Sequence, residues 1–121
     1  MKKGLTCREA LAREWTRLGQ ADKDIVALTS DAKGSTSLGV FAEALPEQFT
    51  EVGIAEQNAT GMAAGLAAVR KRPYVCAPAS LLAARALEQI QADAAYPHTP
   101  GNILPVPRAL TAGAPGAAPP P

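Results

Sequence analysis

The spacing of apolar residues divides the chain into alternating strands and helices. Residues 24–30 (DIVALTS) form a short, continuous apolar run, which is typical of a strand buried on both faces. We expect two further strands over residues 48–52 and 73–77, the second with a proline at its start, where a missing N–H costs least. Strands that alternate with helices predict an α/β fold, in which a parallel sheet is flanked by helices.

The first helix is expected before the first strand. Thr6 and Glu9 have the spacing of a capping box, which predicts a helix over residues 7–18. We expect Gly19 to end this helix. Three apolar residues then share one face of it: Leu11, Trp15 and Leu18.

Three more helices are expected between or after the strands, over residues 38–45, 55–69 and 80–95. The helix at 55–69 has almost no bulky side chains, so another backbone can approach it closely, with Gly61 and Gly65 as close-packing positions. We expect Ser80 to cap the last helix. The apolar residues expected to face inward there are Leu82, Leu87 and Ile90.

Composition and charge narrow the range of partners. The 121 residues suffice for one small domain, and a hydrophobic content of 47% with only 4% aromatics predicts a core of small aliphatic side chains. A net charge of +1 gives no strong attraction to nucleic acid or to an anionic membrane, and no apolar run is long enough to span a bilayer. Cys7 and Cys76 lack metal-ligand spacing and are expected to be reduced in a cytoplasmic protein.

The character of the chain changes after Tyr96. Residues 97–121 are rich in Pro, Ala and Gly, and Arg108 is their only charged side chain. Such a segment cannot bury enough surface to offset the entropy of ordering it, so we expect a folded domain over residues 1–96 and a disordered tail over 97–121. The change also suggests translation in a shifted reading frame, and no role is assigned to His98 in this tail.

Four segments in order resemble the carboxyl-terminal subunit of a split transketolase. They are residues 24–36 (DIVALTSDAKGST), 52–67 (VGIAEQNATGMAAGLA), 71–80 (KRPYVCAPAS) and 84–90 (ARALEQI). That subunit opens with the pyrimidine-binding domain of the thiamine diphosphate enzymes, so the resemblance implies the thiamine diphosphate-binding fold. The resemblance ends at about Tyr96, and we therefore expect the domain to be incomplete.

The resemblance implies a role for three residues. In the family, the acid of the segment GIAEQN hydrogen-bonds the aminopyrimidine ring of the cofactor, and the matching acid is Glu56. This chemistry needs a protonatable acid held away from bulk water, so we expect a neighbouring subunit to shield Glu56. Asp31 matches an acid near the cofactor and substrate channel, and Leu81 stands where the family usually has an aromatic on the pyrimidine ring. Without the resemblance, Glu56 would be an ordinary first-turn acid and Asp31 a turn or helix cap.

The implied activity is the transfer of a two-carbon ketol unit between sugar phosphates with thiamine diphosphate. In the family the diphosphate and its Mg²⁺ are held by a separate, amino-terminal subunit, so we expect an oligomer with that subunit, no metal ligands here, and no activity of this chain alone. Two alternatives stay open. One is a non-catalytic interaction fragment, and the other is a part of a deoxyxylulose-phosphate synthase or of a 2-oxo acid dehydrogenase beta subunit.

Overall fold

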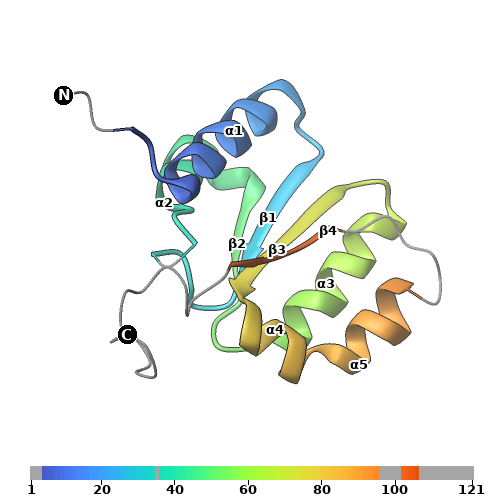
Figure 1. Ribbon diagram of the computed structural model, residues 1–121. Coiled ribbons are helices and arrows are strands. Elements are labelled where there is room, and N and C mark those ends of the chain that lie inside the picture. Colours follow the sequence, from blue (N-terminus) through green and yellow to red (C-terminus); the bar gives the residue numbers. More distant parts are fainter. Residues whose placement is uncertain (1–3, 35, 96–101, 107–121) are drawn as a thin grey trace, which may run out of the picture.

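A single parallel sheet forms the centre of the molecule (Figure 1). The computed structural model describes residues 4–34, 36–95 and 102–106. Its strands lie in the order β2-β1-β3-β4, and every neighbouring pair is parallel. They are β1 (Ile25–Thr29), β2 (Phe49–Glu51), β3 (Arg72–Pro78) and β4 (Asn102–Val106). The expected α/β fold with a parallel sheet is confirmed.

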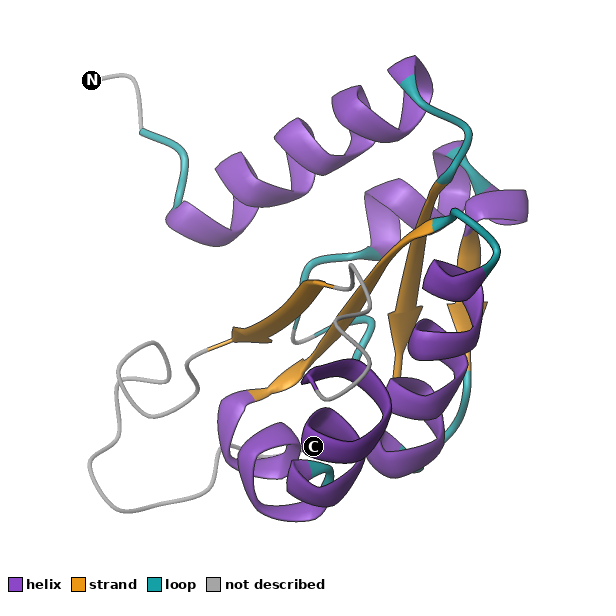
Figure 2. Ribbon diagram, turned by 90° about the vertical axis from the view of Figure 1, so that its right-hand side faces the viewer, coloured by secondary structure: helices purple, strands orange, loops and turns teal. Residues whose placement is uncertain are grey.

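Helices cover both faces of the sheet (Figures 1 and 2). On one face lie α1 (Cys7–Ala21) and α2 (Gly39–Ala44). On the other lie α3 (Glu56–Ala68), α4 (Ala79–Arg85) and α5 (Leu87–Gln89). A 3₁₀ turn (Pro46–Gln48) precedes β2, and a π-helical turn (Ile90–Ala95) follows α5. None of the helices in the described ranges is long and apolar enough to cross a membrane.

Alternating side chains of β1 and β3 divide the core into two clusters, one on each face of the sheet. The cluster under α1 and α2 contains Trp15, Ile25, Ala27, Leu38, Phe41, Leu45 and Cys76. The cluster under α3 and α4 contains Leu28, Ala59, Ala63, Val75, Ala77, Leu82 and Ala86. The second cluster is built largely of alanines, which lets α3 lie close to the sheet.

The capping box that opens α1 is confirmed. The N–H and Oγ1 of Thr6 donate to the carboxylate of Glu9 at 2.7 and 2.9 Å, and the N–H of Glu9 donates back to Thr6 Oγ1 at 3.2 Å. These hydrogen bonds lower the pKa of Glu9, with the bond from the Thr6 backbone contributing most. The prediction that Gly19 ends the helix is wrong, because α1 continues to Ala21.

Gly19 has a packing role instead. It is buried in α1, and a Cβ there would lie 2.7 Å from Leu45 Cδ1 and 2.8 Å from Phe41 Cε2. The missing side chain therefore lets α1 approach the residues of α2 and of the loop that follows. Leu11, expected on the buried face, is exposed, and Ala12 is buried in its place.

The helix expected over residues 80–95 is broken into three pieces, α4, α5 and the π-helical turn. Ser80 does not cap it, since α4 already begins at Ala79 and its first turn has no side-chain cap. Leu82 is buried as expected, whereas Leu87 is half exposed. The break after Arg85 rotates the following turn, which is why Leu87 leaves the inward face.

One part of the segment expected to be disordered forms a strand. Residues 102–106 make β4, which pairs with β3 from Tyr74↔Asn102 to Pro78↔Val106. The expectation of disorder is wrong for these five residues, whose backbone gains the hydrogen bonds of a parallel ladder. The remainder of the segment, including His98 and Arg108, lies outside the described residues.

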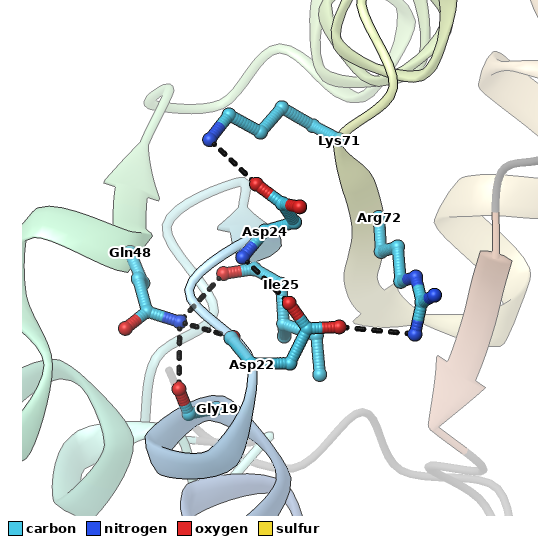
Figure 3. Close-up of polar contacts among 7 residues, drawn as sticks. All are labelled: Gly19, Asp22, Asp24, Ile25, Gln48, Lys71 and Arg72. Carbon is cyan, nitrogen blue, oxygen red and sulfur yellow. Dashed lines mark hydrogen bonds and ion pairs between the residues drawn. The ribbon is translucent and has the colours of Figure 1, made fainter.

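At the amino-terminal ends of the strands, polar contacts join segments that are far apart in the sequence (Figure 3). Gln48 Nε2 donates to three backbone carbonyls, those of Gly19 at 3.0 Å, Asp22 at 3.1 Å and Ile25 at 2.9 Å. Two ion pairs link the start of β1 to the start of β3: Lys71–Asp24 and Arg72–Asp22, each at 3.0 Å. This edge is held by the chain's own groups.

Candidate functional site

The carboxyl-terminal ends of β1, β2 and β3 meet at the opposite edge of the sheet, because the three strands are parallel. The chain leaves β1 toward β2 on one side and later enters β3 on the other side of β1, so the strand order reverses between β1 and β3. In open α/β sheets, ligands bind outside the carboxyl ends of the strands at such a reversal. The residues predicted from sequence follow three different strands at this edge: Asp31 after β1, Glu56 after β2 and Leu81 after β3.

Glu56 is the first residue of α3 and is only 2% exposed. Its Oε2 lies 3.4 Å from Nη1 of Arg85, the last residue of α4. Its Oε1 is buried and has no hydrogen-bond partner in the structure. A buried polar atom without a partner costs about 1–3 kcal/mol, so a hydrogen-bond donor from outside the described residues would stabilise this oxygen.

The shielding of Glu56 comes from its own chain. The sequence led us to expect a neighbouring subunit to exclude water from this carboxyl, but the fold already does so. The start of α3 lies against α4, and Arg85 from α4 reaches the carboxylate. A partner is therefore not needed to bury the acid, although it can still enclose a ligand placed against Oε1.

Asp31 lies in a strained turn that Glu51 stabilises. The residue is exposed and has a φ of 50°, in the left-handed region that few non-glycine residues adopt. Its N–H donates to Glu51 Oε1 at 2.6 Å, and the N–H of Gly53, which has a φ of 73°, donates to the same oxygen at 2.9 Å. Glu51 thus fixes the turn after β1 to the turn that leads into α3.

Leu81 and its neighbour Leu82 point to different surroundings. Leu82 is buried in the core between α3 and the sheet, while Leu81 is only partly buried. Leu81 therefore keeps apolar surface available at the carboxyl edge, which a ring could cover. The cofactor-binding roles of Leu81 and Asp31 stay predictions.

Sequence reasoning gave no role to three residues that shape this edge. Arg85 lies inside the segment 84–90 that carried the resemblance, and Glu51 directly precedes the segment that contains Glu56. Ser30 follows β1, and its Oγ is buried without a hydrogen-bond partner, like Glu56 Oε1. The resemblance included the segment around Arg85 but gave this residue no contact. The contact between Arg85 and Glu56 is seen only in the fold.

Comparison with known proteins gives consistent matches. Residues 3–118 match the family described as "Transketolase, pyrimidine binding domain". The chain is 48% identical over 113 residues to a subunit of the apulose-4-phosphate transketolase of Phocaeicola vulgatus. It is 38% identical over 99 residues to the 1-deoxy-D-xylulose-5-phosphate synthase of Treponema pallidum. These alignments cover 93% and 82% of this chain, respectively.

A solved structure agrees with these matches. The protein described as "Split gene transketolase, inactive beta4 tetramer" superposes with a TM-score of 0.74 at 42% sequence identity, over 83% of this chain. The chain spans 36% of the Phocaeicola relative, 16% of the Treponema relative and 33% of the solved chain. The family match also continues past Tyr96, where the sequence-based resemblance was expected to end.

Proposed function

We propose, since this chain belongs to the family of transketolase pyrimidine-binding domains, that it forms the pyrimidine side of a thiamine diphosphate site. The enzyme containing it would transfer a two-carbon ketol unit between sugar phosphates. The observation that carries the proposal is Glu56 Oε1, a buried carboxyl oxygen without a partner at the carboxyl edge of the sheet.

The residues at this edge fit the cofactor's aminopyrimidine ring. Glu56 Oε1 would accept or give the proton that it shares with a ring nitrogen, and burial keeps water from competing for that oxygen. Leu81 would cover the ring by apolar contact, and Asp31 would border the channel through which substrate arrives. When bound, the cofactor supplies the carbon nucleophile, and the protein supplies position and electrostatics.

The diphosphate and Mg²⁺ would be bound by a separate, amino-terminal subunit. Within the ranges that the structure describes, no three His, Cys, Asp or Glu residues cluster as a metal site would require. The surface of α3 offers room for a partner, because a Cβ on Gly65 would meet no atom within 4 Å. Gly65 therefore has no close-packing role within the described part of this chain. Ile54, which precedes α3 at its other end, is 73% exposed, which also favours contact with another subunit.

The proposal also covers the cellular compartment and the type of reaction. Cys7 and Cys76 are free thiols, which is consistent with a reducing, cytoplasmic compartment and with a role in carbohydrate metabolism such as the pentose phosphate reactions. Transketolase chemistry is favoured over that of a deoxyxylulose-phosphate synthase. The relative named for a transketolase is 48% identical over 93% of this chain, against 38% over 82% for the synthase.

The test is reconstitution with the diphosphate-binding subunit from the same source, thiamine diphosphate and Mg²⁺. We expect this mixture to transfer ketol units, and this chain alone to be inactive. Glu56→Gln keeps the size of the side chain but removes its acid, and should lower kcat by about 10²–10⁴-fold. Glu43→Gln, the same change at an exposed acid of α2, is the matched control and should have no effect.

Three outcomes separate the alternatives. Transfer that survives Glu56→Gln would contradict the proton role of this acid. Association of the unaltered chain with its partner, without any transfer, would favour a non-catalytic interaction fragment. Condensation of pyruvate with glyceraldehyde 3-phosphate, in place of ketol transfer, would favour the synthase.

A further inference from the structure

Glu56 and Arg85 form an asymmetric pair. The side chain of Glu56 is 3% exposed and that of Arg85 is 54% exposed, so the acid is inside and most of the guanidinium remains in solvent. Arg85 Nη1 contacts Oε2, and Oε1 has no partner. Within the described residues, Arg85 is the only side chain that pairs with this carboxyl. The two oxygens of Glu56 are therefore not equivalent.

The positive charge of Arg85 compensates for the burial of the Glu56 carboxyl group. A carboxylate buried without a counter-charge is strongly unfavourable, so removal of the charge that faces the buried side chain of Glu56 is destabilising. The pair also suits the two helices, since Glu56 begins α3 at its positive end and Arg85 ends α4 at its negative end. Arg85 thus supplies the opposite charge that a buried carboxylate at Glu56 requires.

We infer that Arg85 is the positioning residue of this site: it engages Oε2, leaves Oε1 as the oxygen that faces the ligand, and supplies the counter-charge of the buried acid. The inference rests on the proposed function, in which Oε1 shares a proton with a ring nitrogen. With its guanidinium at Oε2, Arg85 holds the carboxyl group in the orientation that presents Oε1 to that nitrogen. Arg85 therefore orients the acid of the site by acting through Glu56.

The first test needs no cofactor. Urea unfolding of the full chain is compared for Arg85→Gln, Glu56→Gln and the double variant at neutral pH. Arg85→Gln should lower the folding equilibrium constant by at least about tenfold, because it leaves a buried carboxylate unpaired. Adding Glu56→Gln should recover most of this loss, since no charge then remains to be paired.

Arg85→Lys is the second variant, and it keeps the inference testable if Arg85→Gln does not fold. Lysine retains the positive charge, so the stability of this variant should stay close to that of the unaltered chain. A loss as large as that of Arg85→Gln would mean that Arg85 acts by packing alone and would overturn the inference. A double variant no more stable than Arg85→Gln would overturn it as well.

The second test uses the assembled enzyme. Arg85→Gln should lower kcat with little change in the KM for thiamine diphosphate, because a carboxyl group that is no longer held in place affects the reaction more than binding, and Arg85→Lys should restore most of the rate. An equal loss of kcat in both variants, or a change in KM alone, would count against the inference. If the unaltered enzyme transfers nothing, the proposed function fails, whereas the unfolding test still decides whether Arg85 and Glu56 are coupled as a charge pair.

Discussion

The two edges of the sheet use polar groups in opposite ways. At the amino-terminal edge, Gln48 donates to three carbonyls, and two ion pairs join β1 to β3 (Figure 3). At the carboxyl-terminal edge, Ser30 Oγ and Glu56 Oε1 are buried without partners. The only other such atom in the described ranges is Gln89 Oε1.

Positive φ angles do not distinguish the two edges. Asp31 and Gly53 at the carboxyl edge have φ angles of 50° and 73°, and Arg70, in the turn before β3 at the amino edge, has a φ of 66°. Unpaired buried polar atoms lower stability, and in natural proteins they are found mainly at functional sites. The difference is therefore in the polar side chains: one edge pairs them across the sheet, while the other leaves two buried atoms unpaired, which supports the proposed ligand site there.

The largest effect on stability is expected at Gln48. Gln48→Ala removes three hydrogen bonds, those to the carbonyls of Gly19, Asp22 and Ile25, and the bonds to Gly19 and Ile25 are buried. The free energy of unfolding should fall by about 3 kcal/mol, measured by urea denaturation. Gln20→Ala, at an exposed glutamine of α1, is the control and should change it by less than about 0.5 kcal/mol. Equal effects of the two variants would mean that the amino edge is not held by Gln48.

The next largest effect is a pH dependence of the free energy of unfolding, caused by Cys76. This residue lies within β3, between the two edges. Burial raises the pKa of its thiol. The folded pKa therefore exceeds the unfolded one, so the resulting stability is complete below the ordinary thiol pKa and is lost as the pH rises above it. Between about pH 8.5 and pH 9.5 the free energy of unfolding should fall by about 1 kcal/mol.

Two variants isolate this pH effect. Cys76→Ala should lack that component of the pH dependence, and Cys7→Ala, at the exposed thiol, should retain it. Thiol-labelling rates give a second measurement: Cys7 should react at once and Cys76 only when the sheet opens. Rapid labelling of Cys76 in the native chain would contradict this prediction, because it would mean that the sheet opens readily and exposes the thiol.

A smaller effect of opposite sign is expected at the carboxyl edge. Ser30→Ala removes a buried hydroxyl that has no partner, so the chain should become more stable by about 1 kcal/mol. Thr29→Val, at the preceding residue, removes a hydroxyl that donates to the Cys76 carbonyl at 2.9 Å and should be destabilising. A loss of stability in both variants would remove the distinction between the two edges.

The smallest effect is expected for the exposed ion pair at the amino edge. The side chains of Lys71 and Asp24 are 40% and 56% exposed, so solvent screens their attraction. Lys71→Ala should therefore cost at most about 1 kcal/mol, and less at high salt. Lys33→Ala, at an exposed lysine in the loop after β1, is the reference. A larger cost that persists in salt would assign the stability of this edge to charge and not to Gln48.

Local patterns predicted most of the fold. The apolar run over residues 24–30 contains β1 (Ile25–Thr29), and the helix expected over 55–69 is α3 to within a residue at each end. Both patterns depend on residues that are close together in the sequence, and so does the capping box of Thr6 and Glu9. The broken helix after Arg85 was missed, because its apolar spacing also fits a continuous helix.

The candidate site could be predicted only in part. Glu56, Asp31 and Leu81 came from a resemblance, which names positions but gives no contacts. The pairing of Glu56 with Arg85 spans 29 residues and that of Gln48 with Gly19 also spans 29, so both depend on how the elements pack. No local pattern distinguishes the partnered oxygen of Glu56 from the unpartnered one.

The short outer strand has a consequence for assembly. β2 contains only three residues and pairs on one side with β1, so its free side exposes very few N–H and C=O groups. A second molecule cannot extend the sheet over such a brief stretch, which also protects the monomer from uncontrolled edge-to-edge pairing. Contact with another molecule along β2 would therefore run through side chains and not through a sheet shared by the two chains.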